Sequence, residues 1–350
     1  MEIVFLSRRS QRGIIVIAFL LFFINPFATF AVEKRDTLVY KPYRDTSKLV
    51  KAQVVSIDPS TSFVFYKTRP FGFLGYVPRN LVDICKVSTR KKNLPKVGML
   101  IGGTAVLVLF DQKIIDASQQ FGRFIHLDAE RKFNTALSIN MGGFHVPVLD
   151  IPQNLNSGFY FLGEGWPSVL IAGGFYGYGS VAKDYRALQT SSELAEMFIT
   201  LGITTQFIKR ITGRQSPFTA TSPGGKWHPF TNPAYYQKHV PSHDAFPSGH
   251  LATAMATITI LSGNYPTNRY IKPIGYSLMG ILGYAMMNNG VHWASDYPLA
   301  IAIGYTFGKI ALGNGQQVIH KNGTKSMTSS LFTPILIGEN GLGLSYRLIF

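Results

Sequence analysis

The chain has 350 residues, enough for one large domain or two small ones, and it is more apolar than a typical soluble enzyme, with 46% hydrophobic and 15% charged residues. Its formal net charge of +16 favours a negatively charged partner, and because the basic residues are scattered without any nucleic-acid-binding motif, we expect anionic lipid and not nucleic acid. The single cysteine, Cys85, excludes an intramolecular disulfide framework and a cysteine-rich metal site.

Residues 1–31 are predicted to be a secretory signal peptide. Arginines precede the apolar run Gly13–Phe23, and Thr29 and Ala31 place small residues where a signal peptidase cleaves. Pro26 near the end of the run favours cleavage, and an uncleaved signal anchor is the alternative. In both cases the rest of the chain is expected to be exported to the cell envelope, either associated with a membrane or in the periplasm.

Residues 32–96 form a basic, irregular segment. The runs Gln53–Ile57 and Phe63–Tyr66 have the composition of short β-strands and are separated by turn residues. Two interpretations fit the excess of lysine and arginine: contact with an anionic membrane surface, or an ordinary solvated face.

Residues 97–313 have a helical pattern and predict an all-α bundle. The first apolar run, Val97–Phe110, ends at Asp111, is short for a bilayer span and suits a buried or half-inserted helix. The other expected helices are Trp166–Val181, Ser191–Ile211, Gly249–Leu261, Pro273–Asn288 and Tyr297–Leu312.

Two further segments are expected to be non-helical. The long loop Gly213–Phe246 is rich in proline, glycine and aromatic residues and is expected to border the functional site. The tail, residues 314–350, is expected to carry a β-hairpin over Thr333–Phe350 with its turn at 338–341.

The segment Pro247–His250 reads Pro-Ser-Gly-His and precedes an apolar, helical run. Ser248 is placed as an N-cap and Gly249 leaves its backbone N–H accessible, so that the positive end of the helix can face an anion. His250, in the first turn, can supply a proton to a leaving oxygen. An ordinary helix start with an incidental histidine is the alternative.

His292 and Asp296 are four residues apart. On a helix they share a face, and the carboxylate can bind one imidazole nitrogen, leaving the other free to attack an electrophile or to bind a ligand. The alternative is a buried histidine paired for structural reasons.

Lys209 and Arg214 lie near the end of an expected helix, where cations commonly complement the helix dipole. Together with the two histidine motifs, they become candidates for binding a phosphate.

This ordered set of motifs resembles the type 2 phosphatidic acid phosphatase and vanadium haloperoxidase superfamily. The family signatures are a Lys with Arg-Pro seven and eight residues later, then Pro-Ser-Gly-His, then Ser-Arg with a His and an Asp downstream. Lys209 and Pro217 match the first signature, residues 247–250 match the second, and His292 and Asp296 match the third. The similarity covers about residues 97–313 and implies the helical bundle of this superfamily.

The resemblance also implies roles for individual residues. His292 is the nucleophile that forms a phospho-histidine, Asp296 orients it, and His250 protonates the leaving group. Lys209 and the turn Ser248–Gly249 hold the phosphate oxygens. No cofactor and no metal ion takes part.

The chain departs from the family at both arginines, because Ser216 and Met286 stand in their places. The loss of one charge-assisted bidentate contact costs about 2–4 kcal/mol of transition-state stabilisation. The candidates for replacing these contacts are Arg214, Lys226 and His228, with Asn288 or Asn289 as neutral donors.

We therefore expect metal-independent hydrolysis of a phosphate monoester, with an anionic lipid phosphate, a lipid pyrophosphate or a phosphorylated small molecule as substrate. A catalytically weak or inactive protein that binds an anionic lipid headgroup is the alternative. A third interpretation, a vanadate-dependent haloperoxidase with His292 as metal ligand, is disfavoured because vanadate binding also relies on the two arginines.

Overall fold

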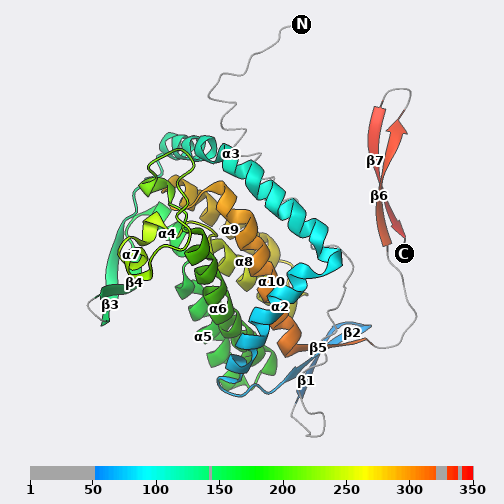
Figure 1. The fold of residues 1–350 in the computed structure, drawn as a ribbon. Helices are drawn as coiled ribbons and strands as arrows, with labels where there is room; N and C mark the ends of the chain where they lie inside the picture. The colour runs from blue at the N-terminus through cyan, green and yellow to red at the C-terminus, as the bar shows by residue number, and fades with distance from the viewer. Residues whose placement is uncertain (1–51, 142–143, 321–328, 338–340, 350) are drawn as a thin grey trace.

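The computed structural model describes residues 52–141, 144–320, 329–337 and 341–349, and it shows a mostly helical protein (Figure 1). This confirms the expected all-α class with a small N-terminal sheet. The predicted signal sequence at 1–31 lies outside the described residues, as does most of the predicted hairpin turn at 338–341.

A bundle of long helices carries the motifs. It consists of α5 (Gly165–Ala182), α6 (Tyr185–Thr212), α8 (Gly249–Asn264), α9 (Ile271–Asn288) and α10 (Tyr297–Gly315). The sequence predicted each of them, and the structure extends most of them at their ends. The bounds follow from capping: the side chain of Asp184 accepts a hydrogen bond from the Ala187 N–H at the start of α6, and Gly213 ends α6 in the left-handed conformation, with φ of 58°.

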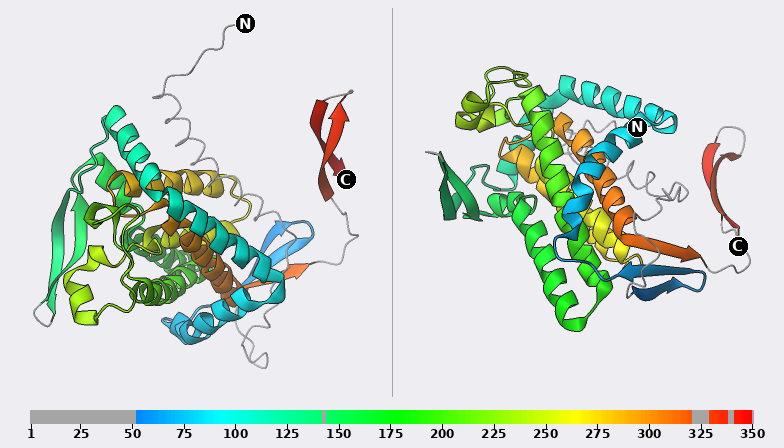
Figure 2. Two further views of the ribbon diagram at one scale, coloured as in Figure 1. Left: turned by 45° about the horizontal axis from the view of Figure 1, so that its top comes forward. Right: turned by 60° about the horizontal axis from the view of Figure 1, so that its bottom comes forward.

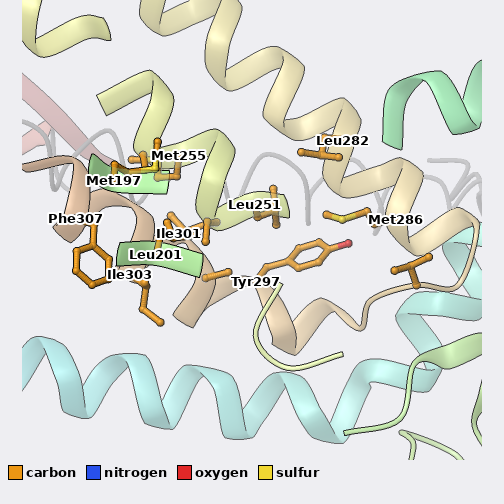
Figure 3. Packing of buried hydrophobic residues seen from close by; sticks show 14 of the residues in the cluster. Met197, Leu201, Leu251, Met255, Leu282, Met286, Tyr297, Ile301, Ile303 and Phe307 are labelled. Carbon is orange, nitrogen blue, oxygen red and sulfur yellow. The ribbon is translucent and has the colours of Figure 1, made fainter. Parts of the chain in front are cut away.

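The hydrophobic core lies where α8 and α10 meet, with α6 and α9 packed against them (Figure 3). Its side chains include Met197 and Leu201 of α6, Leu251 and Met255 of α8, Leu282 and Met286 of α9, and Ile301, Ile303 and Phe307 of α10. Gly304 allows the closest approach, because a Cβ at this position would collide with the carbonyl oxygen of Ala252. Helices α8 and α10 are therefore in backbone contact.

Helices α2 (Val77–Thr89) and α3 (Leu94–Phe124) precede the bundle, and α3 runs along its outside (Figures 1 and 2). The helix extends well beyond the apolar run Val97–Phe110 that predicted it. The helix continues because the carboxylate of Asp111 is buried against Arg214 and does not need solvent.

Among the described residues, the stretch Lys91–Phe124 is the one helix long and apolar enough to cross a membrane. None of its most apolar 18-residue window is buried inside the protein. Met99, Ile101, Val106 and Leu109 are among its exposed side chains. The outer face of α3 is thus apolar and open.

The strands form small antiparallel sheets. Strand β2 (Thr61–Tyr66) pairs with β1 (Ala52–Asp58) and β5 (Gln316–His320). The sequence predicted β1 and β2 as short strands. Strands β6 (Ser329–Ile337) and β7 (Gly341–Ile349) pair with each other, which confirms the C-terminal hairpin.

A further hairpin, β3 (Phe133–Met141) and β4 (Phe144–Pro152), was not predicted. It leads into the short helix α4 (Leu155–Phe161), while α7 (Pro233–Lys238) interrupts the long loop between α6 and α8. The β3–β4 hairpin and the β1–β2–β5 sheet lie on opposite sides of the bundle (Figures 1 and 2).

Candidate active site

The two motif histidines lie together in the folded chain. His250 is in the first turn of α8, and His292 lies between α9 and the short helix η5 (Ala294–Asp296). Their ring centroids are 5.9 Å apart, with an angle of 67° between the ring planes. His292 is almost fully buried and His250 is half-buried. Two segments that are 42 residues apart in the sequence thus place their imidazoles around one small volume.

Asp296 lies behind His292. Its Oδ2 atom is 3.4 Å from the Nδ1 atom of His292 and accepts a 2.7 Å hydrogen bond from the backbone N–H of Trp293. The carboxylate is fully buried. The N–H of Trp293 fixes this carboxylate so that it faces one nitrogen of the ring, which leaves Nε2 as the nitrogen available for chemistry.

The Pro-Ser-Gly-His turn is attached to the same segment. The Ser248 N–H donates to the carbonyl oxygen of Asp296 (3.1 Å), and the Ser248 side chain accepts from the Leu251 N–H (3.4 Å) as the N-cap of α8. The space in front of Gly249 is open, since a Cβ there would meet no atom within 4 Å. The N-terminal end of α8 therefore presents accessible backbone N–H groups beside the two histidines.

Lys209, in the last turn of α6, is buried and pairs with Asp244, with 3.0 Å between Nζ and Oδ2. Its positive charge is one of the causes that lower the pKa of His250. Lys209 is therefore close to the histidines, with part of its charge already compensated by Asp244.

The sequence predicted that the guanidinium of Arg214 contacts the substrate, but the structure places it in the core. The side chain is completely buried. Its Nη1 atom donates to Asp296 Oδ1 (2.6 Å) and Ser295 Oγ (2.6 Å), and its Nη2 atom donates to Asp111 Oδ2 (2.6 Å). Arg214 thus holds Asp296 from the side opposite His292 and is committed to two carboxylates.

Asp111 is a residue that the sequence analysis missed as part of this site. It accepts from Arg214 and also from the backbone N–H of Ser295 (3.0 Å). Its position inside an apolar helix, where a charged residue has to find a partner, was the signal that could have revealed it.

The positions that lack the family arginines are closed to solvent. Ser216 is 1% exposed, and Met286 is 0% exposed, with its sulfur 3.7 Å from the hydroxyl of Ser248. Met286 therefore packs beneath the Pro-Ser-Gly-His turn as a core residue.

Of the other candidate substitutes, His228, Asn288 and Asn289 have partners of their own. Lys226 is exposed, and the ring of His228 lies 5.4 Å from that of His243. Asn288 is buried and donates to Asn156 Oδ1 (3.2 Å). Asn289 is oriented so that its amide can donate to the carbonyl oxygens of Ala285 and Met286.

An unexpected cation lies near the histidines. The guanidinium carbon of Arg131 is 5.4 Å from the ring centroid of Tyr160 and 5.7 Å from that of Phe218. The ring of Tyr160 is in turn 4.4 Å from that of His250. No sequence motif surrounds Arg131, and it precedes Lys209 by 78 residues, so nothing in the pattern connected it with this site.

The electrostatic setting of His250 follows from these neighbours. Burial lowers the pKa of His250 well below its usual value, and the nearby His292, Lys209 and Arg131 lower it further. These neighbours favour the neutral imidazole of His250 at pH 7 when no anion is bound. An anion bound between these groups would favour its protonated form.

Among the described residues, no group of three or more His, Cys, Asp or Glu side chains is arranged to hold a metal ion. Two imidazoles, a helix N-terminus and cations lie near one another, and this arrangement suits an anionic, tetrahedral ligand.

Residues 192–317 match the model of the PAP2 superfamily. The matched segment starts within α6, ends in β5 and contains Lys209, His250, His292 and Asp296, whereas Asp111 and Arg131 lie outside it. No curated protein and no solved structure matches the chain.

Proposed function

We propose that this protein hydrolyses phosphate monoesters through a phospho-histidine intermediate, without a metal ion. The match of residues 192–317 to the model of the PAP2 superfamily supports a phosphatase that acts on phosphate esters. The observation that carries the proposal is the 5.9 Å separation of the His250 and His292 rings, with Asp296 behind the second ring. A phosphoryl group between the two imidazoles would contact the nucleophile on one side and the proton donor on the other.

In the first step, Nε2 of His292 attacks phosphorus, the bond from phosphorus to the ester oxygen breaks, and His250 gives a proton to the departing oxygen. Asp296 stabilises the positive charge that develops on the His292 ring, at 3.4 Å from Nδ1. In the second step, water attacks phosphorus and passes a proton to His250. The P–N bond breaks, and inorganic phosphate leaves.

The negative charge of the substrate would promote protonation of His250, which the first step requires. His250 must be protonated to act as an acid, yet burial and its cationic neighbours lower its pKa. A phosphate dianion placed among Lys209, His292 and His250 opposes these positive charges and raises the pKa of His250. The proton donor is therefore charged in the substrate complex and neutral without it.

A lipid phosphate or lipid pyrophosphate is the preferred substrate class. The exposed apolar face of α3 and the net charge of +16 favour association with an anionic membrane, where such a headgroup would be presented. We also propose that the protein is exported and acts at the envelope membrane or in the periplasm.

The test is trapping of the intermediate. Purified protein mixed with a radiolabelled phosphate monoester and quenched within one turnover should carry acid-labile, base-stable label, as expected for phospho-histidine. His292→Ala should carry no label and should have no turnover, while His239→Ala, which alters an exposed histidine, should behave like the unsubstituted protein. Hydrolysis by His292→Ala at the unsubstituted rate would reject the mechanism.

A second candidate function is binding of an anionic headgroup without cleavage. Two observations favour it: Ser216 and Met286 are buried, and Arg214 is paired with two carboxylates. Within residues 192–317, none of these three residues therefore provides the phosphate contacts that the two family arginines make. Saturable binding of phosphatidic acid vesicles, without release of phosphate from any monoester or pyrophosphate substrate, would establish this alternative and exclude the phosphatase.

A further inference from the structure

We propose that Arg131 binds the phosphoryl oxygens of the substrate and takes the place of the two family arginines. This inference rests on the proposed phosphate site and deepens it, because it assigns the missing guanidinium contact to a residue outside the matched PAP2 segment. The ligand class is a tetrahedral oxyanion: a phosphate monoester during turnover, or orthophosphate as product.

The geometry brings Arg131 to the histidines through a single aromatic ring. Tyr160 contacts His250 on one side, at 4.4 Å between ring centroids, and its ring also lies 5.4 Å from the guanidinium carbon of Arg131. Phe218, two residues after Ser216, provides the second ring at 5.7 Å. Arg131 therefore lies beside the loop from which the family arginine would extend.

The positive charge of Arg131 also acts on this site. Its charge lowers the pKa of His250, alongside the charges of His292 and Lys209. A cation whose charge acts on His250 is close enough to attract a phosphoryl group bound between His250 and His292.

The other cations near the histidines are already paired. Lys209 binds Asp244, and Arg214 binds Asp111 and Asp296. Arg131 is exposed, and no carboxylate of the described residues lies within ion-pair distance of it. It is therefore the arginine whose hydrogen-bond donors remain available to an oxyanion, and a guanidinium can bind two phosphate oxygens at once.

The backbone around Arg131 is fixed, which allows the side chain to be presented in one place. The N–H of Lys132 donates to Ser157 Oγ in α4 (3.0 Å), and the Lys132 carbonyl accepts from the Gln153 N–H (2.8 Å). Phe133 packs edge-on against Tyr160 with ring centroids 5.8 Å apart. The hairpin β3–β4 and α4 thus serve as a support that holds Arg131 beside the site.

Lys132 provides a matched control. It is the next residue in the chain and carries the same charge, but its Nζ binds Asp128 and Glu130, each at 2.9 Å. Arg131→Met and Lys132→Met therefore make the same change in net charge, and only the first removes the proposed phosphate contact.

The experiment measures orthophosphate binding by calorimetry and hydrolysis of a phosphate monoester for the full-length protein and three variants. Arg131→Met should weaken orthophosphate binding and lower kcat/KM by about 10- to 100-fold, Arg131→Lys should lose less because it keeps the charge, and Lys132→Met should stay within about twofold of the unsubstituted protein. Thermal unfolding of all variants should coincide, since the side chain of Arg131 is exposed.

The outcomes separate this inference from the proposed function. Turnover by the unsubstituted protein with equal phosphate affinity in Arg131→Met and Lys132→Met would overturn the role of Arg131 and leave the phosphatase intact. Arg131-dependent phosphate binding without hydrolysis of any ester would support the binding role and reject the phosphatase. A protein that neither binds orthophosphate nor hydrolyses an ester would reject both.

Discussion

Arg214 and Asp296 form an ion pair in which neither side chain is exposed to solvent, with 2.6 Å between Nη1 and Oδ1. The same guanidinium binds Asp111 through Nη2, so one cation compensates two buried carboxylates. Asp296 meanwhile faces His292. The charge balance of the core and the orientation of the proposed nucleophile therefore depend on the same arginine.

Replacement of Arg214 should destabilise the fold strongly. Arg214→Met leaves Asp111 and Asp296 buried without their cation, and we expect a loss of about 3–5 kcal/mol in the free energy of unfolding, measured in urea at neutral pH. Arg269→Met, which alters an exposed arginine, should change it by less than about 0.5 kcal/mol. A loss for Arg214→Met as small as that of the control would show that the carboxylates have another source of compensation.

Restoring the family arginine at Met286 should not restore family-like activity. The side chain of Met286 is fully buried in the core, so Met286→Arg forces an unpaired charge among apolar side chains. We expect a loss of several kcal/mol in stability and a lower kcat, measured by thermal unfolding and phosphate release. Met99→Arg, on the exposed face of α3, is the control for the substitution itself. Higher kcat/KM in Met286→Arg with unchanged stability would mean that this position opens to the substrate.

Glu196 should make stability depend on pH. Burial raises the pKa of this carboxyl to about 7, although the amides of Asn80 and Asn314 donate to it. The pKa is higher in the folded state than in the unfolded state. Between about pH 4.5 and 7 the folded protein therefore keeps a proton that the unfolded chain has already released. Stability should fall across this window by up to about 3 kcal/mol and then level off.

Glu196→Gln should flatten this slope when unfolding is followed at several pH values. Some slope will remain, because burial also raises the pKa of Glu193. An unchanged slope in the variant would assign the effect to other groups.

Removal of the Lys209 charge should shift the pH profile of the reaction. Lys209 lowers the pKa of His250, and so Lys209→Met should raise that pKa. Since protonated His250 is the proposed acid, the decline of kcat on the alkaline side should move to higher pH, together with a fall in kcat/KM from loss of the proposed phosphate contact. A profile that falls in height without moving would separate Lys209 from the protonation of His250.

The helices of the bundle were predictable because each has a long, largely apolar run, and at α8 the N-cap Ser248 also marked the first turn. The start of α6 was predicted too late, at Ser191, because its cap at Asp184 precedes a polar first turn. The meeting of His250 and His292 also followed from the order of the motifs. The roles of the site residues remain predictions, to be tested by the experiments above.

Other features depended on contacts that are distant in the sequence. Asp111 looked like a helix end, and only its pairing with Arg214, 103 residues away, explains why α3 continues through it. Arg214 looked like a phosphate ligand, and its burial between two carboxylates assigns it to Asp296. Arg131 carried no motif at all, because its place beside Tyr160 is created by the hairpin β3–β4 and by α4.

Gly304 has a consequence for how this site tolerates sequence change. His250 opens α8 and Asp296 stands directly before α10, and these two helices touch through main-chain atoms at Ala252 and Gly304. At this point the separation of α8 and α10, the helices that carry His250 and follow Asp296, is limited by main-chain atoms. Any larger side chain at position 304 would push the two helices apart and so change the distance between His250 and Asp296, although Gly304 itself lies inside the bundle.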